Sequence, residues 1–151
     1  MSKSMNKLAL AISITAKAFE NKLDKGGQPY ILHCLRVMNA VDDDEDTKCG
    51  AVMHDLVEDT DEKSEINYTF ELLTKLGFSD KTIGIMHLVT HQKSTDYMEY
   101  IKAIAVSDEA TKIKLADLRD NSDITRLKGL GKKDLDRMEK YHRAYLYLSN
   151  R

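Results

Sequence analysis

Residues 49–60 read CGAVMHDLVEDT, an apolar run with a histidine and a carboxylate at its centre. The valines, methionine and leucine around this pair are typical of a buried helix. Burying an ionised carboxylate is costly unless a cation or several hydrogen bonds compensate it, so Asp55 needs a partner. A divalent metal ion bound by His54 and Asp55 would satisfy both side chains at once.

Two further acidic residues lie four positions beyond this pair. If the helix, expected from about Thr47 to Glu58, continues that far, Glu58 lies near the face of His54 and Asp59 near that of Asp55. Three carboxylates crowded around an imidazole need a metal ion or protonation to coexist. Alternatively, Glu58 and Asp59 only solvate the end of the helix, and this segment alone leaves both readings open.

Two more candidate ligands lie elsewhere in the chain. His33 follows a glycine pair and Pro29 and stands one turn into an apolar run. Asp117 lies in an apolar stretch, where it shares a helix face with Lys114 and Asn121. A salt bridge between Asp117 and Lys114 would account for the lysine but not for the asparagine.

The two histidines and two aspartates would form a site of mixed nitrogen and oxygen ligands. Such a set suits Mn²⁺, Fe²⁺ or Zn²⁺ better than Ca²⁺. Open coordination positions would hold water, whose pKa the metal lowers. The sequence therefore predicts a metal centre built from His33, His54, Asp55 and Asp117.

Helical periodicity covers most of the chain, and strand-like alternation is nearly absent, which predicts an all-α fold. Ser79, Thr95 and Ser107 are candidate helix N-caps, Gly77 is a candidate C-terminal glycine, and the acidic run 42–46 should cap the third helix. We expect about seven to eight helices, over residues 3–21, from 29 through 38, 47–58, 66–76, 80–90, 96–106, from 108 through 118 and 132–148.

The bulk composition limits the class of protein. The 151 residues are 42% hydrophobic and contain no linker or repeat, which favours a single domain over residues 1–151. The net charge of -2 argues against a general nucleic-acid coat protein. No window approaches the ~20 apolar residues of a membrane span, and two cysteines are no disulfide framework, so we expect a cytoplasmic protein without a membrane partner.

Together, three motifs resemble those of a known family. They are His33 with the string GQPYIL that precedes it over residues 27–32, HDLVEDT over residues 54–60, and KLAD over 114–117 with Asn121. In order and spacing they are similar to the motifs of HD-domain hydrolases, and more narrowly of the hydrolase domain of RelA/SpoT-type alarmone enzymes. The resemblance covers about residues 25–121 and implies a compact helical bundle.

The resemblance also implies roles for individual residues. The metal ligands would be His33, His54, Asp55 and Asp117, and the metal would typically be Mn²⁺. Glu58 and Asp59 match the pair that positions and activates the attacking water. Lys25 and Asn121 match residues that contact the nucleotide. The reaction implied is hydrolysis of the 3′-pyrophosphate of guanosine tetra- or pentaphosphate, which gives GDP or GTP and pyrophosphate.

The chain departs from the family pattern at two positions. Asp24 stands where the family usually has an arginine, and a negative charge there would oppose an anionic substrate. Cys34 replaces the usual proline after the metal histidine, and we expect it to be a small buried packing residue. The chain ends soon after the hydrolase core, so we expect no alarmone synthesis.

Several other residues have open roles. His87, His91 and His142 match no ligand motif. The segment with His91, Tyr97 and Tyr100 would line the substrate pocket, although the helical spacing of the two tyrosines favours packing in the core. Lys93, Lys112, Lys114 and Arg119 could supply positive charge to phosphates. The tyrosine-rich C-terminal helix would serve packing or self-association into a homo-oligomer.

The sequence thus predicts a metal-dependent hydrolase of a nucleotide phosphate ester. Guanosine tetra- or pentaphosphate is the first candidate substrate, and NADPH or a nucleoside monophosphate is the alternative. A second alternative is a module that senses a nucleotide without hydrolysing it. The Glu58 and Asp59 pair argues against that, because a module that only binds has little use for a water-activating pair.

Overall fold

The structure, a computed structural model, describes residues 6–42 and 44–150. These residues form eight α-helices and one short 3₁₀ helix, with no strand beyond an isolated bridge, which confirms the all-α fold. The elements are α1 (Lys7–Ala18), α2 (Ile31–Ala40), α3 (Glu45–Val52), α4 (Phe70–Lys75), α5 (Asp80–Val89), α6 (Tyr97–Ile104), α7 (Asp108–Asn121), η1 (Ile124–Arg126) and α8 (Lys132–Ser149).

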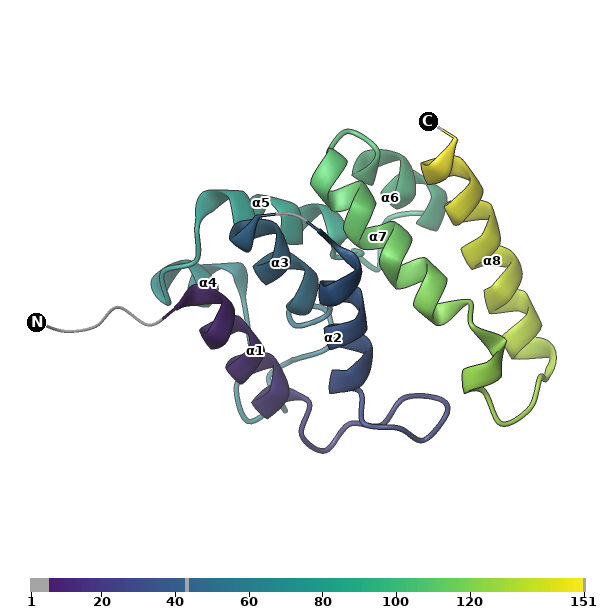
Figure 1. Ribbon diagram of the computed structural model, residues 1–151, viewed down its shortest axis with the longest axis horizontal. Helices are drawn as coiled ribbons and strands as arrows, with labels where there is room; N and C mark the ends of the chain where they lie inside the picture. Colours follow the sequence, from purple (N-terminus) through teal and green to yellow (C-terminus); the bar gives the residue numbers. More distant parts are fainter. Residues whose placement is uncertain (1–5, 43, 151) are drawn as a thin grey trace, which may run out of the picture.

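Helices α3 and α7 are the central elements of the bundle. Helix α3 packs against α1, α2 and α5, whereas α7 lies between α2 and the long C-terminal helix α8 (Figure 1). One apolar cluster joins α1 to α3 and α4, and a second joins α2 to α5, α6, α7 and α8. Helix α2 contributes to both clusters, so it fixes α3 and α7 relative to each other.

Most of the predicted capping residues are confirmed. The side chain of Ser79 accepts a hydrogen bond from the third residue of α5, and Ser107 caps α7 in the same way. Asp44, within the acidic run, caps α3. Gly77 adopts a φ of 93°, the left-handed conformation that ends α4. The predicted cap of α6 was wrong, because Asp96 rather than Thr95 accepts the first-turn N–H.

The predicted third helix was too long. Helix α3 ends at Val52, and residues 53–59 form consecutive turns. The His54 ring accounts for this end, because its Nδ1 atom donates to the Ala51 carbonyl oxygen, which Asp55 N–H would bind in a continuing helix. His54 and Asp55 therefore lie on a turn rather than on a helix.

The first and fourth helices are also shorter than expected. Helix α1 starts at Lys7, and residues 3–5 of its predicted start lie outside the described part. Helix α4 starts at Phe70 with Thr69 as its cap. The backbone N–H of Tyr68 donates to the Thr60 hydroxyl, which holds the preceding segment against the turns in place of a helical turn.

None of the described helices combines the length and the apolar character that crossing a membrane would require.

Candidate metal centre and its pocket

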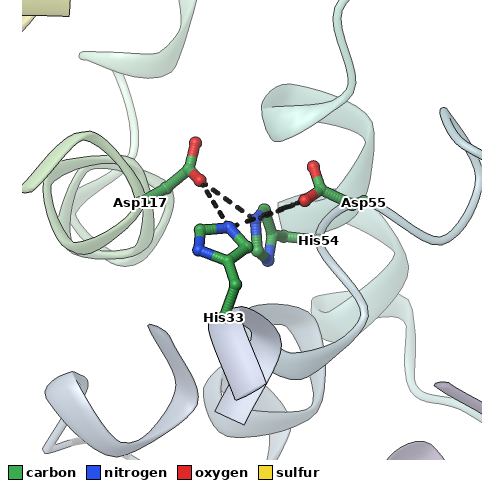
Figure 2. A group of neighbouring side chains, drawn as sticks. All are labelled: His33, His54, Asp55 and Asp117. Atoms are coloured by element: carbon green, nitrogen blue, oxygen red, sulfur yellow. Dashed lines mark hydrogen bonds and ion pairs between the residues drawn. The ribbon is translucent and has the colours of Figure 1, made fainter. Parts of the chain in front are cut away.

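Four side chains from three parts of the chain converge at the centre of the molecule. His33 comes from α2, Asp117 from α7, and His54 and Asp55 from the turn after α3 (Figure 2). Each offers one ligand atom, and these atoms all lie within 4.8 Å of one another. The two histidines and Asp117 are buried, and Asp55 is half-buried. The structure thus brings together all four residues predicted to bind the metal.

Both imidazole rings direct their Nε2 atom to the centre of the cluster. His54 Nδ1 lies 2.7 Å from the Ala51 carbonyl oxygen, and His33 Nδ1 lies 2.6 Å from Asp120 Oδ2. We assign the proton to Nδ1 in both rings, because carbonyl and carboxylate oxygens only accept hydrogen bonds. The Nε2 atoms, with their lone pairs, then face Asp117 at 3.0 Å from His33 and 3.2 Å from His54.

The donor set fits a divalent metal ion. His33 Nε2 is buried and finds no hydrogen-bond partner of acceptable geometry among the described residues. An uncompensated buried nitrogen costs free energy unless another species binds it. Imidazole nitrogens and carboxylate oxygens at this spacing are ligands that Mn²⁺, Fe²⁺ and Zn²⁺ accept. The cluster therefore has the chemistry of a site for a divalent cation.

The electrostatics of the cluster favour a cation. Burial alone would lower the pKa of His54, but the charges of Asp55 and Asp117 raise that pKa well above its ordinary value. Burial alone would raise the pKa of Asp117, but Lys114 and the two histidines hold it well below its ordinary value. A site that stabilises imidazolium in this way also attracts a metal ion, and the two compete for it.

The two aspartates are held by further hydrogen bonds. Asp117 Oδ2 accepts from Lys114 Nζ at 2.9 Å, and its Oδ1 accepts from Asn121 Nδ2 at 2.9 Å. The hydroxyl of Tyr30 donates to Asp55 Oδ2. The salt bridge considered from the sequence exists, and Asn121 binds the other carboxylate oxygen.

A pocket of about 420 Å³ opens onto the cluster. This volume suits a small-molecule ligand. Asp55 and Asp117 lie in its wall together with Glu58 and Asp59, the predicted water-activating pair. Lys25, predicted to contact the nucleotide, also lines the pocket. The structure therefore gathers the predicted residues around one cavity.

Glu58 and Asp59 have different partners in the pocket wall. Glu58 accepts the backbone N–H of His91 at 2.8 Å, and Asp59 pairs with Lys22 Nζ at 3.0 Å. Partial burial raises the pKa of both carboxyl groups, and the nearby charge of Asp55 raises it further. Both groups are therefore stronger proton acceptors than ordinary surface carboxylates.

The expected repulsion by Asp24 is offset within the protein. Its Oδ2 pairs with Arg126 Nη2 at 2.8 Å, and its Oδ1 accepts the backbone N–H groups of Gly26 and Gln28, each at 2.9 Å. Both carboxylate oxygens are thus used, and Arg126 neutralises the charge. Asp24 orders the loop that carries Lys25 and brings a guanidinium to the pocket from a distant part of the chain.

Sequence reasoning missed several pocket residues. Three cations that line the pocket come from η1 and α8, where no motif marked them: Arg126, Arg137 and Lys140. It also missed Asp120, although a signal was present. His33 and Arg36 lie one helical turn apart on α2, and Asp117 and Asp120 lie one turn apart on α7. If the two helices pack so that His33 meets Asp117, Arg36 therefore also meets Asp120.

Several of the residues with open roles lie around the pocket. His91, Tyr97 and Tyr100 line the pocket, and the two tyrosines also belong to the apolar core, so both expected roles apply. Of the four predicted phosphate-binding cations, Lys114 lines the pocket, whereas Arg119 stacks on Tyr145 outside it. Cys34 is buried, as expected.

Comparisons with known proteins bear on the fold. No family model matches this sequence, and no curated protein does. Among solved structures, it is similar to a metazoan ortholog of SpoT that hydrolyses ppGpp, with a TM-score of 0.75 and 24% identity over 98% of this chain and 88% of that one. At this identity the likeness establishes the architecture. The chain therefore has the all-helical fold that the resemblance to HD-domain hydrolases implied.

Proposed function

We propose that this protein is a metal-dependent hydrolase of a nucleotide phosphate ester, with the 3′-pyrophosphate of guanosine tetra- or pentaphosphate as its substrate. One observation carries the proposal. Four buried or half-buried ligand groups converge beside a pocket that is also lined by the carboxylates of Glu58 and Asp59. The shared fold with a SpoT ortholog that hydrolyses ppGpp supports the choice of substrate.

His33, His54, Asp55 and Asp117 would hold the divalent ion, with Mn²⁺ as the expected metal. When bound, the ion supplies a Lewis acid that neutralises phosphoryl oxygens and makes water more acidic. The remaining chemistry belongs to the chain. Asp117 and Asp55 are oriented by Lys114 and Tyr30, so the ligand oxygens are fixed before substrate arrives.

Glu58 and Asp59 would manage the proton of the attacking water. Glu58 is held by the backbone N–H of His91, so it keeps one orientation. Asp59 is paired with Lys22, which also lies 4.2 Å from the centre of the Tyr30 ring. A carboxylate held beside the attacking water can accept its proton as a general base.

The charges of the pocket suit an anionic substrate. Lys114, Arg137 and Lys140 line it, and burial together with the charges of the other two lowers the pKa of Lys140. Cations that crowd one another in this way are stabilised by a bound anion. Asn121 and Lys25 also line the pocket and would contact the nucleotide.

A panel of nucleotides tests the proposal. The full chain, loaded with Mn²⁺, is incubated with guanosine tetraphosphate, NADPH or nucleoside monophosphates, and the products are separated by ion-exchange chromatography. We expect GDP and pyrophosphate from guanosine tetraphosphate. The Asp55→Ala variant, which lacks one ligand, is the control and should release neither.

The other outcomes identify the alternatives. Orthophosphate released only from NADPH or a monophosphate would replace the substrate while keeping the reaction type. Tight nucleotide binding measured by calorimetry, without turnover in excess Mn²⁺, would indicate a sensing module and contradict hydrolysis.

A further inference from the structure

Asp120 contacts the metal cluster without belonging to it. Its Oδ2 atom lies 2.6 Å from Nδ1 of His33, on the side of the ring opposite the other three ligands. The side chain is 13% exposed and the His33 side chain 1%, so the hydrogen bond is largely shielded from water. A buried, charge-assisted hydrogen bond of this length is among the stronger polar contacts in proteins.

The position of Asp120 decides which nitrogen of His33 can bind a cation. A carboxylate cannot donate, so the proton stays on Nδ1 and the lone pair on Nε2. Nε2 then lies 3.0 Å from Asp117 Oδ1, in the centre of the cluster. A carboxylate on the far nitrogen also makes the imidazole a more basic ligand and fixes the plane of its ring.

Two arginines hold the carboxylate in place. Arg36 donates to both oxygens, with Nε at 2.7 Å from Oδ1 and Nη2 at 3.1 Å from Oδ2. Arg126 Nη1 donates to Oδ2 at 2.9 Å and to the Asp120 carbonyl oxygen at 2.7 Å. With both oxygens engaged, Asp120 has little freedom to rotate away from His33.

The network also reaches the wall of the pocket, which Arg126 and Asp24 line. The second terminal nitrogen of Arg126 binds Asp24, which orders the loop that carries Lys25. A continuous chain of hydrogen bonds thus runs from the metal cluster to the loop that carries Lys25, through His33, Asp120, Arg126 and Asp24. Its members come from α2, α7, η1 and the loop before α2, so no single element fixes the ring alone.

We propose that Asp120 is a positioning residue for the metal centre, which holds His33 in the orientation and tautomer that bind the ion. The proposal rests on the proposed function only in requiring that the cluster bind a divalent metal. His54 receives the same support from the Ala51 backbone carbonyl, which no substitution removes. Asp120 is therefore the position at which this support can be tested.

The test uses Co²⁺ alone as the probe, without nucleotide. Metal-depleted full-length protein is titrated with Co²⁺, and binding is followed by the visible absorption of the ion. We expect Asp120→Ala to weaken Co²⁺ affinity by about 10- to 100-fold and to change the absorption spectrum. Asp120→Asn keeps an oxygen that can accept from Nδ1, so its affinity should lie between those of Asp120→Ala and the wild type.

Two matched variants separate positioning from general damage. Arg36→Gln removes a partner of the same carboxylate but leaves the contact with His33, and we expect less than about a threefold loss of affinity. Asp136→Asn removes a carboxylate that is 62% exposed and pairs only with Lys132, and it should bind Co²⁺ as the wild type does. Circular dichroism confirms that each variant is folded.

Each outcome has a defined reading. Equal Co²⁺ affinity in wild type and folded Asp120→Ala would overturn the proposal, as would an equal loss in Arg36→Gln and Asp120→Ala. If Asp120→Ala does not fold, Asp120→Asn decides, and unchanged affinity and spectrum in that variant would overturn the proposal. A wild type that binds no Co²⁺ would instead contradict the proposed function itself.

Discussion

Each histidine of the cluster uses one ring nitrogen for support and presents the other to the ligand site. The supports differ, since His54 binds a backbone carbonyl and His33 binds Asp120. A backbone oxygen fixes the ring as soon as the turn forms, whereas Asp120 requires α2 and α7 to be packed together. The geometry of the cluster therefore depends on tertiary structure at His33 and on local structure at His54.

Asp24 gives a prediction about pH. Burial alone would raise its pKa, but hydrogen bonds from Arg126 and from the backbone N–H groups of Gln28 and Gly26 outweigh it and hold the pKa below its ordinary value. A lowered pKa in the folded state stabilises the protein above the ordinary pKa, and this contribution disappears as the pH falls through the folded value. Above pH ~5, wild type should exceed Asp24→Asn in unfolding free energy by about 1.5–3 kcal/mol.

Urea unfolding between pH ~6 and ~2.5 measures this difference, which should shrink as the pH falls below about 4. Asp136→Asn is the control, because Asp136 is exposed and pairs only with an exposed lysine. Unfolding free energies of wild type and Asp24→Asn that stay parallel over the whole range would contradict the assigned role of Asp24.

Which residues could be predicted from the sequence depends on how local their signals are. His54 and Asp55 stand out because a charged pair interrupts an apolar run, and His33 and Asp117 follow once the family motifs are compared. Asp120 has no local signal of this kind, and its only signal is a spacing of one helical turn from Asp117 that matches the spacing of Arg36 from His33 on another helix. Its role depends on a histidine 87 positions away, which only the fold brings near.

At the scale of elements, the turns over residues 53–59 carry two of the four proposed metal ligands. Thr60 closes them, because its buried hydroxyl donates to the Leu56 carbonyl oxygen at 2.8 Å and accepts the Tyr68 N–H at 2.9 Å. Thr60→Val would leave that N–H without a partner in the interior. We expect a loss of about 1–3 kcal/mol in unfolding free energy, measured by urea denaturation.

Thr74→Val is the matched control for this prediction. The Thr74 hydroxyl also donates to the carbonyl four residues earlier, but it is exposed and accepts no buried N–H. Its substitution should change the unfolding free energy by no more than about 0.5 kcal/mol. Equal losses in the two variants would show that Thr60 does not close the turns.

The loop that carries Lys25 and the 3₁₀ helix η1 approach each other closely at Gly26. A Cβ atom at this position would overlap the backbone carbonyl oxygen of Arg126, so Gly26→Ala must displace one of the two segments. We expect it to destabilise the fold by about 1–3 kcal/mol and to weaken the pairing of Asp24 with Arg126.

Gly84→Ala is the opposite case and serves as control. Gly84 lies in α5, and nothing lies within 4 Å of an added Cβ. This substitution should raise the unfolding free energy by about 0.5–1 kcal/mol, because alanine is the better helix former. Thermal unfolding of both variants checks the pair, and a stabilising Gly26→Ala would contradict the close approach.

The helix boundaries show where sequence patterns lose information. The caps of α3, α5 and α7 were predicted because a side chain caps the first turn of its own helix. The predicted end of α3 and the predicted start of α4 were wrong, because the side chains of His54 and Thr60 compete for backbone groups. Such competition depends on three-dimensional contacts that periodicity does not report.

At the scale of the whole molecule, a chain of net charge -2 attracts an anion only through local charges. Lys114, Arg137 and Lys140 provide them in the pocket. Raising the ionic strength from about 0.1 M to about 1 M shortens the screening length from about 10 Å to about 3 Å. We therefore expect KM for a polyphosphorylated nucleotide to rise by about tenfold, with a smaller change in kcat.

Lys140→Gln should raise KM at low salt and reduce its salt dependence. Lys132→Gln is the control, since Lys132 is 88% exposed and pairs with Asp136 outside the pocket. Steady-state kinetics at several salt concentrations distinguishes the two. A KM that does not respond to salt would mean that the pocket cations do not attract the substrate.

The most direct test of the account combines metal content and hydrolysis in one preparation. Wild type and Asp55→Ala are equilibrated with Mn²⁺, freed of excess ion, analysed for bound metal and assayed for pyrophosphate release from guanosine tetraphosphate. The wild type should retain about one ion per chain and be active, and Asp55→Ala should lose both, with activity reduced by more than about 100-fold. Full activity in metal-depleted Asp55→Ala would contradict the central claim.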